Sequence, residues 1–381
     1  MENKPLCPYF GNCGGCTAQH ISYNLQVQNK KNLIVAHFIK NSIEAPEPAI
    51  FFGKPYNYRN RMDFAFCKKG LGLRKKDNYN SILYIGNCPI SNSKINGFLA
   101  ELNAWLKKNP EIEPFDIGSC KGAMKYAVIR AAEFSDSTSV SFLVNSDSNK
   151  LLGHIKLIEE FAENSKAKNI AVGKVLAKGD ISASFDHFAV KGSLSMEEFI
   201  CGRKIAYSVF SFFQNNSAMA EKMAVYCKKI FEKYETKNAA LIDLYGGAGT
   251  FGAVLADNFS KTVVIDNDPL NIQCAKGNLI SNCIKNADVA CADAGCLSRL
   301  KLGSMETFVI ADPPRAGLGQ KAIRKIMDFN PKSIIYISCN PIQMAKELRL
   351  FRKNYNIVST AVFDLFPQTV HIEAIAEMER K

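Results

Sequence analysis

Residues 240–251 read Ala-Leu-Ile-Asp-Leu-Tyr-Gly-Gly-Ala-Gly-Thr-Phe, a short apolar run that ends in a glycine-rich turn. Glycines at such a turn let the backbone adopt positive φ and approach a ligand closely. The spacing is not the G-x-G-x-x-G pattern of dinucleotide sites, and no Gly-Lys-Ser/Thr follows as in a phosphate-binding P-loop. The stretch predicts a strand, a tight turn and a helix that together face a ligand.

Further apolar runs follow this turn, and each alternates with a helical pattern. They lie at 261–266, 287–293, 306–314 and 333–339, and two more strands are expected near 355–378. Alternation of strands with helices predicts a parallel sheet that is covered by helices on both faces. We therefore expect the α/β class, with a Rossmann-like domain over residues 206–381.

The chain before this domain has a different pattern, without regular alternation. It predicts helices near 23–39, 95–108 and 151–166, a hairpin over 58–73, and antiparallel strands between 125 and 190. This is an α+β pattern. The expected organisation is a turn-rich segment over residues 1–20, a central α+β domain over residues 21–205, and then the Rossmann-like domain.

Two acidic residues follow later strands of the Rossmann-like domain. Asp266 ends the run 261–266, 17 residues past Gly249, and Asp293 ends the run 287–293. A carboxylate at the first place can accept hydrogen bonds from a ribose diol, and one at the second can reach an adenine edge. The set predicts an adenosine-bearing cofactor. Because the dinucleotide and P-loop patterns are absent, S-adenosylmethionine is favoured over NAD or ATP.

Reactive side chains stand at the ends of the last parallel strands. Asp312 begins an Asp-Pro-Pro-Arg motif, and Cys339 lies in Ser-Cys-Asn-Pro. Ligands of open α/β sheets bind at the carboxyl ends of the strands, so these motifs should meet at one edge. A thiol near a helix N-terminus can act as a nucleophile, and the later carboxyl of Glu373 can serve as a general base.

The N-terminal segment carries Cys7, Cys13 and Cys16 with the spacing C-x5-C-x2-C. The chain has 13 cysteines, and we see neither a signal peptide nor an apolar stretch that could span a membrane. We therefore expect a cytoplasmic protein whose thiols stay reduced. The spacing suits either an iron–sulfur cluster or a zinc ion and does not separate them.

The net charge of +12 is concentrated near the N-terminus, where residues 1–80 contain 12 Lys and Arg against 5 Asp and Glu. A basic surface favours a polyanionic partner such as nucleic acid. The side chains that we expect to contact phosphates are Arg59, Arg61, Lys68, Lys69, Arg74, Lys75 and Lys76.

Seven motifs stand in a fixed order along the chain. They are CPYFGNCGGC from Cys7, YRNRMDFAF at 58–66, SFFQNN at 211–216, and then ALIDLYGGAGTF, ADPPRAG, YISCNP and VHIEA. Together they resemble the RNA 5-methyluridine methyltransferase family, in its iron–sulfur type. The chain departs from many members at Gly246, where they have cysteine. It resembles the shorter members, which lack an N-terminal RNA-binding barrel domain of the TRAM type.

The resemblance implies roles for individual residues. Those implied in S-adenosylmethionine binding are Gln214, Tyr245, Thr250, Asp266 and Asp312. Those implied as ligands of a [4Fe-4S] cluster are Cys7, Cys13, Cys16 and Cys88. Cys339 would be the nucleophile and Glu373 the proton acceptor.

The implied activity is S-adenosylmethionine-dependent methylation of uridine C5 in RNA by an enzyme of class 2.1.1. Uracil C5 is a poor nucleophile, and addition of the Cys339 thiolate to C6 would activate it. Glu373 would then remove the C5 proton so that the thiolate can leave. The target base must leave its stack to reach such a pocket. We expect a monomer that acts on 23S ribosomal RNA, with the T-loop of tRNA as the alternative.

Two other functions compete with this one. A cytosine-C5 or amine methyltransferase is disfavoured, because Arg315 follows the two prolines where amine enzymes usually have an aromatic residue. ADPPR also lacks the second cysteine typical of RNA cytosine enzymes. A non-catalytic iron–sulfur RNA-binding protein would have no use for Cys339 or Glu373, and a test of S-adenosylmethionine binding distinguishes it.

Overall fold

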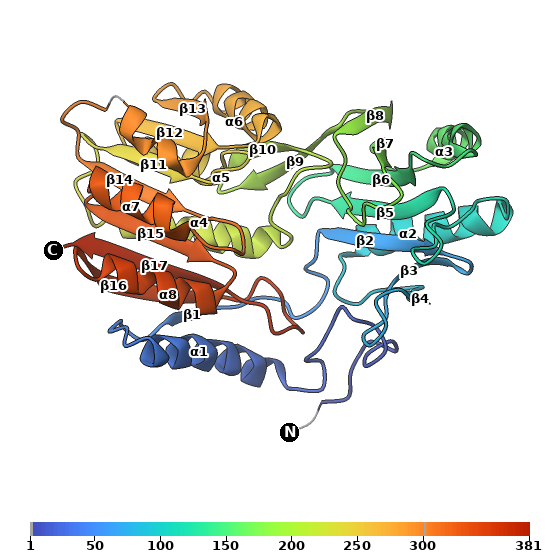
Figure 1. Cartoon of the computed structure of the whole chain (residues 1–381), viewed down its shortest axis with the longest axis horizontal. Helices are drawn as coiled ribbons and strands as arrows, with labels where there is room; N and C mark the ends of the chain where they lie inside the picture. Colours follow the sequence, from blue (N-terminus) through green and yellow to red (C-terminus); the bar gives the residue numbers. More distant parts are fainter. Residues whose placement is uncertain (1–2, 301) are drawn as a thin grey trace.

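The computed structural model describes residues 3–300 and 302–381, which form two large sheets (Figure 1). A two-stranded hairpin, β9 (Ser195–Ile200) and β10 (Arg203–Ser208), lies in the chain between them. Each large sheet contains both parallel and antiparallel pairs of strands. The predicted α/β class is confirmed.

The C-terminal sheet has the strand order β1-β16-β17-β15-β14-β11-β12-β13. Its strands are β1 (Ala49–Phe51), β11 (Ala240–Leu244), β12 (Lys261–Asp266), β13 (Ala287–Cys291), β14 (Thr307–Ala311), β15 (Ser333–Ser338), β16 (Tyr355–Phe363) and β17 (Glu373–Arg380). The strands from β11 to β15 run parallel, and β17 is antiparallel to both of its neighbours. The order reverses at β11, and such a switch point is where open α/β sheets bind ligands.

Helices cover both faces of this sheet, as the alternating pattern predicts. On one face lie α4 (Ser217–Phe231), α5 (Thr250–Leu255), which continues into the 3-10 turn η1 (Ala256–Asn258), and α6 (Pro269–Ser281). On the other lie η2 (Ala294–Arg299), α7 (Gly319–Phe329) and α8 (Pro341–Phe351). Alternate residues of β11 enter the two cores, with Leu241 on the first face and Ile242 on the second, because successive strand side chains point in opposite directions.

The start of the chain contributes to this C-terminal sheet. Helix α1 (Tyr23–Lys40) buries Ile34 and Phe38 in the same core as α7 and α8, and it lies along α8 in Figure 1. Strand β1 pairs in parallel with the edge strand β16. Residues 23–51, which the sequence pattern places in the central domain, are thus part of the C-terminal unit. Nothing local in the sequence indicates this long-range pairing.

The central sheet has the order β4-β3-β2-β5-β6-β7-β8. Its strands are β2 (Arg61–Cys67), β3 (Gly70–Arg74), β4 (Ile82–Tyr84), β5 (Met124–Ala131), β6 (Thr138–Asn145), β7 (Asn169–Val175) and β8 (Asp186–Lys191). The hairpin predicted over 58–73 is present as β2 and β3. Helices α2 (Ser93–Lys108) and α3 (Leu151–Asn164) pack on one face.

The opposite face of the central sheet joins the core of the C-terminal unit. Val128 and Leu143 belong to the same apolar cluster as Phe213, which precedes α4, and Met219 in its first turn. The two units are therefore held against each other by buried apolar surface, which fixes their relative position. In the described part of the chain, no helix is long and apolar enough to cross a membrane.

Candidate functional site

The carboxyl ends of β11, β12 and β14 bring three predicted residues to one edge. Leu244, the last residue of β11, pairs with Ile265 of β12 and Ala311 of β14. The residues that follow these three positions are Tyr245, Asp266 and Asp312, respectively. Asp312 also donates its backbone N–H to the Leu244 carbonyl, at 3.3 Å. The predicted convergence of these residues at the switch point is therefore observed.

The glycine-rich turn after β11 has the predicted left-handed backbone. Tyr245 has φ +59°, Gly247 has φ +54° and Gly249, the N-cap of α5, has φ +78°. The Gly247 N–H donates to Oδ2 of Asp266 at 2.9 Å. The turn is thus clamped onto the neighbouring strand, and Thr250 opens the helix that follows.

The two acidic residues predicted to bind adenosine differ in their surroundings. Oδ1 of Asp266 accepts from the Asp268 N–H at 2.9 Å and from the Asn271 amide at 3.2 Å. A carboxylate offers about four acceptor positions, so the oriented Asp266 can still bind a ribose hydroxyl. Asp293 is exposed, and its Oδ1 caps η2 by accepting the Gly295 N–H at 2.7 Å.

Gln214 reaches the same edge from the loop before α4. Its side-chain amide donates to Oδ2 of Asp312 at 3.3 Å, and its backbone carbonyl accepts the Asn60 side-chain amide at 3.0 Å. Burial raises the pKa of Asp312 to about 7. Gln214 and Asp312 thus form a polar pair beside the strand ends, where a charged amino acid group can be bound.

Cys339 and Glu373 lie next to each other at the ends of adjacent strands. The terminal ladder partners of β15 and β17 are Ser338 and Ala374, so Cys339 and Glu373 are the next residues on each strand. Glu373 is buried, with 6% of its surface exposed, whereas Cys339 is half-buried. The predicted nucleophile and base therefore share one end of the sheet.

The electrostatics of these groups show that they form one site with Asp312. Burial, followed by the charges of Glu373 and Asp312, raises the pKa of Cys339 to about 11, and the nearby Arg315 partly offsets this. Burial and the charge of Asp312 also hold the pKa of Glu373 well above its usual range. In the free protein, the Cys339 thiol is therefore protonated at neutral pH, and burial disfavours the charged form of Glu373.

Supporting residues that the motifs did not single out hold the edge in place. Asn340 caps α8 and donates its side-chain amide to the Arg315 carbonyl at 3.1 Å, which joins the two reactive loops. The buried Glu347 accepts from the backbone of Leu318 and Gly319, each at 3.0 Å. Their roles depend on tertiary contacts, and no local spacing predicts them.

Asp243 is a second feature that the sequence does not reveal. Its side chain is fully buried, and burial raises its pKa to about 7. Oδ2 accepts the Gly252 N–H at 2.8 Å, whereas Oδ1 has no hydrogen-bond partner among the described residues. An unpartnered buried oxygen below the glycine turn is costly in an apolar environment and marks this end of the sheet as built for a polar ligand.

The four predicted cluster cysteines come together from distant parts of the chain. A cavity of about 410 Å³ is lined by Cys7, Cys13, Cys16 and Cys88. The backbones of Cys13 in the turn-rich segment and Lys75, just after β3, form an isolated antiparallel β-bridge. Across the described residues, no three His, Cys, Asp or Glu side chains form a group that could hold a metal ion. The four cysteines thus line one cavity.

The cavity has further properties that bear on ligation. Burial raises the pKa of Cys16 to about 11, so an uncompensated thiolate there is unfavourable. The cationic side chains of Arg59, Arg74, Lys75 and Lys76 line the same cavity and can offset negative charge held by the cysteines.

The basic residues of the hairpin divide into two groups. Arg61 pairs with Asp63 at 2.8 Å, and Arg74 pairs with Asp180 at 3.0 Å, so these two guanidinium groups hold the central domain together. Exposed lysines without an ion-pair partner in the described part of the chain are Lys68, Lys69, Lys75 and Lys76. These lysines, more than the arginines, offer charge to a phosphate backbone.

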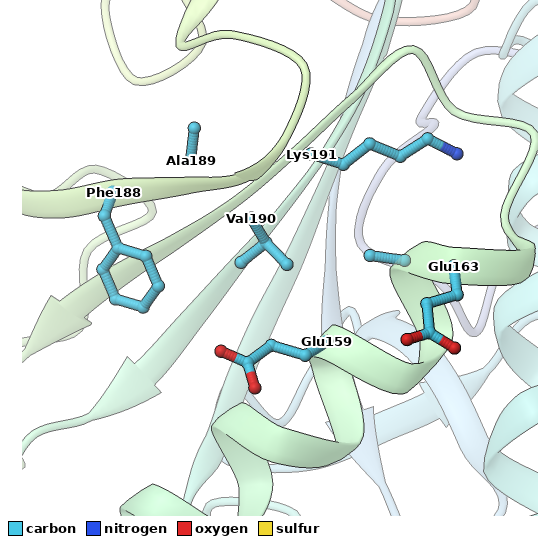
Figure 2. Close-up of a pocket in the computed structure, with 7 residues that line it drawn as sticks. Glu159, Glu163, Phe188, Ala189, Val190 and Lys191 are labelled. Atoms are coloured by element: carbon cyan, nitrogen blue, oxygen red, sulfur yellow. The ribbon is translucent and has the colours of Figure 1, made fainter.

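Another hollow, of about 530 Å³, lies between α3 and β8. Figure 2 shows Glu159 and Glu163 of the helix facing Phe188 and Val190 of the strand. None of the predicted site residues lines it, and we assign it no role in the site.

Comparison with known proteins gives consistent matches over most of the chain. The sequence model of the family described as tRNA (Uracil-5-)-methyltransferase matches residues 22–381. An uncharacterized RNA methyltransferase of Caldanaerobacter subterraneus subsp. tengcongensis is 31% identical over 100% of this chain and 86% of its own length. The tRNA (uracil(54)-C(5))-methyltransferase of Pyrococcus furiosus is 29% identical, covering 98% of this chain and 85% of that protein.

A solved structure shares the fold. It is the Pyrococcus abyssi tRNA (uracil-54, C5)-methyltransferase in complex with S-adenosyl-L-homocysteine. It superposes with a TM-score of 0.78 at 24% identity and covers 97% of this chain and 86% of that one. The arrangement of both sheets is therefore a known one.

Proposed function

This chain belongs to the tRNA (uracil-5-)-methyltransferase family and is an RNA uracil-C5 methyltransferase of class 2.1.1, and from that premise we propose that it forms 5-methyluridine through a covalent adduct between Cys339 and C6 of the base. The observation that carries the proposal is the meeting of Cys339, Glu373 and Asp312 at one end of the C-terminal sheet. A thiol beside a buried carboxyl is the pair that addition and elimination at uracil require.

Cys339 and Glu373 act in sequence in this proposal. The Cys339 sulfur bonds to C6 of the extruded uracil, and the electron pair of the C5–C6 double bond makes C5 nucleophilic. S-adenosylmethionine, when bound, supplies the methyl group that C5 takes up. Glu373 then accepts the C5 proton, the double bond forms again, and the Cys339 sulfur leaves with the electron pair of its bond to C6.

The raised pKa values indicate how the two groups are controlled. In the free protein, the buried site disfavours both the Cys339 thiolate and the Glu373 carboxylate. Arg315 lowers the pKa of Cys339, so it supports the thiolate at the moment of attack. Burial of Glu373 gives a carboxylate of increased basicity, which suits removal of a proton from carbon.

The strand ends fit S-adenosylmethionine. We propose that Asp266 binds the ribose diol, Asp293 the adenine edge, and Gln214 with Asp312 the amino acid part. Tyr245 and Thr250 would complete the site from the left-handed turn and the start of α5. What supports this assignment is the clamped turn, the oriented Asp266 carboxylate and the unpartnered buried oxygen of Asp243.

The cysteine cavity brings together the four residues that the family resemblance implies as ligands of an iron–sulfur cluster. A [4Fe-4S] cluster is held by four cysteine thiolates, one on each iron, so its ligands surround a volume. Cys7, Cys13, Cys16 and Cys88 line one cavity and are the ligands that the family resemblance implies, so we propose the cluster, with a structural role.

Two RNA substrates are candidates, tRNA and 23S ribosomal RNA. Relatives whose names state a substrate include the tRNA (uracil(54)-C(5))-methyltransferases of Pyrococcus furiosus and Pyrococcus horikoshii, which favours a tRNA loop. The expectation of 23S ribosomal RNA rests on the resemblance to short family members and stays a prediction. Both substrates present a uridine in a loop, where the cost of base extrusion is smallest.

Methylation of defined transcripts tests this function. The purified protein is incubated with S-adenosylmethionine and either tRNA or 23S ribosomal RNA, and the modified nucleoside is mapped by mass spectrometry. We expect 5-methyluridine at one loop position of one of the two RNAs. Methylation at cytosine or at an exocyclic amine, or no methylation of either RNA, contradicts the proposal.

A further inference from the structure

The loop 364–372 connects β16 to β17 and leads directly into Glu373. Each of its backbone carbonyls from residue 365 to residue 368 accepts a hydrogen bond from a different segment of the chain. The donors, in that order, are the Asn216 side-chain amide, the Lys30 ammonium, the Tyr58 hydroxyl, and the N–H groups of Thr17 and Ala18, at 2.9 to 3.2 Å. The route into Glu373 is therefore set by contacts far away in the sequence.

The most extensive of these contacts joins Gln26 of α1 to Gln368. The Gln26 amide donates to Oε1 of Gln368 at 3.0 Å, and its Oε1 accepts the Gln368 N–H at 3.1 Å. The same amide also donates to the carbonyls of Ala18 and Ile21, at 2.9 and 2.8 Å. Both glutamines have only 3% of their surface exposed. One buried side chain thus holds the loop and the N-terminal segment together.

Gln368 needs such support, because its backbone has φ +67°. This left-handed conformation is unfavourable for a residue with a side chain and persists where the surroundings impose it. The paired amides recognise both the backbone and the side chain of Gln368. Gln26 therefore selects a loop conformation that the isolated segment would rarely adopt.

Lys30, one turn after Gln26, holds the start of the same loop. Its ammonium lies 2.7 Å from Oδ1 of Asp364, and both side chains are buried, at 5% and 1% exposure. A helix that packs on a core normally buries apolar residues. Gln26 and Lys30 instead form a buried polar stripe that contacts loop 364–372, which indicates that α1 is specialised for holding this loop.

Building on the proposed function, we infer that Gln26 and Lys30 are positioning residues that place the Glu373 carboxylate for proton removal from C5. They do not touch the reacting atoms. Thr17 and Ala18 of the turn-rich segment bind the same loop. The position of this segment and the position of the Glu373 carboxylate therefore depend on each other. Cys339, at the end of β15, does not depend on the loop for its own position.

A positioning role and a general effect on folding can be distinguished by measuring attack by Cys339 and proton removal by Glu373 separately. Loss of base placement should leave attack by Cys339 intact and slow the release of the methylated RNA. The test variant is Gln26→Met, which keeps length and removes all four hydrogen bonds, and Lys30→Met is the second. The matched control is Gln28→Met, since Gln28 is exposed on the same helix.

Two RNAs are compared for each protein, one with uridine and one with 5-fluorouridine at the target position. The fluorine cannot be removed as a proton, so the second RNA reports attack and methyl transfer without the final elimination. For Gln26→Met we expect trapping of 5-fluorouridine RNA at the wild-type rate. With uridine RNA we expect release roughly 10- to 100-fold slower, a loss typical of a displaced catalytic group, and a protein–RNA adduct that survives denaturation.

Other outcomes overturn the inference. Release at the wild-type rate in both variants shows that the loop needs neither contact. An equal loss of trapping and release, including a variant that does not fold, shows that the contacts serve the fold alone. If the wild-type protein itself fails to trap 5-fluorouridine RNA, the proposed function fails, which is a separate result.

Discussion

Cys339 and Glu373 stand side by side at the ends of β15 and β17, one residue beyond the ladder partners Ser338 and Ala374. Neighbouring strands lie about 4.8 Å apart, and directly opposite residues of an antiparallel pair project from the same face. The attacking sulfur and the accepting carboxyl are thus brought together at one end of the sheet. A pyrimidine ring that is bonded at C6 to the sulfur has its C5 within reach of such a carboxyl.

Replacement of Glu373 with glutamine should stop the reaction after methyl transfer. The variant keeps the shape of the side chain but cannot accept the C5 proton, so turnover should fall by roughly 10²- to 10⁴-fold, the usual contribution of a general base. Denaturing gels with ordinary uridine RNA should show a stable adduct that the wild-type protein does not accumulate. Rapid release of methylated RNA by the variant would exclude Glu373 as the base.

The pH dependence of adduct formation follows from the thiol. Because the pKa of Cys339 is raised to about 11, its reactive thiolate becomes more populated as the pH rises, by about tenfold per pH unit below that value. Trapping of 5-fluorouridine RNA should therefore accelerate steadily from roughly pH 6 to pH 9.

The same experiment on Glu373→Gln supplies the control. The charge of Glu373 contributes to the raised pKa of Cys339, so its removal should shift the rate profile to lower pH. A profile that is flat in the wild-type protein, or one that does not move in the variant, would contradict the assigned electrostatics.

The motifs at the strand ends were predictable because each is local. A short apolar run that ends in a glycine turn, in Asp-Pro-Pro or in Ser-Cys-Asn-Pro has few structural interpretations, and parallel strands bring their carboxyl ends to one edge. The positions of Tyr245, Asp266 and Asp312 at adjacent strand ends follow from that rule. The position of Glu373 beside Cys339 depends on the antiparallel register of β17, which no local sequence pattern contains. Its role as the partner of Cys339 was inferred only from the family resemblance.

The contacts of the N-terminal region illustrate what the sequence could not reveal. Strand β1 pairs with β16 across more than 300 positions, and Gln26 bonds to Gln368 across 342. Gln26 and Gln28 look alike in the sequence, yet one is buried against the loop and the other is exposed. Likewise, Arg61 and Arg74 read as phosphate ligands until their ion pairs with Asp63 and Asp180 are seen.

Metal content tests the cysteine cavity independently of catalysis. We expect protein purified without oxygen to contain about four irons per chain and to show the broad visible absorbance of a cluster. Cys88→Ser should lose the iron, whereas Cys67→Ser should keep it, since Cys67 does not line the cavity. One zinc per chain, or full iron content in Cys88→Ser, would refute the cluster assignment.

The exposed lysines of the hairpin should supply affinity for RNA. Replacement of Lys75 and Lys76 with alanine should weaken RNA binding and reduce the slope of log K against log salt concentration by about 0.7 to 0.9 for each phosphate that is no longer neutralised. Lys285→Ala, at an exposed position before β13, is the matched control. Unchanged affinity and slope in the double variant, with iron content preserved, would place the RNA on another surface.

Identification of the residue that becomes bonded to RNA tests the central claim most directly. The wild-type protein is incubated with S-adenosylmethionine and 5-fluorouridine RNA, digested, and the cross-linked peptide is sequenced by mass spectrometry. The account predicts a methylated nucleotide attached to Cys339, no adduct in Cys339→Ala, and a loss of methylation in that variant of about 10³-fold or more. An adduct on another residue, or methylation of uridine that persists in Cys339→Ala, would contradict it.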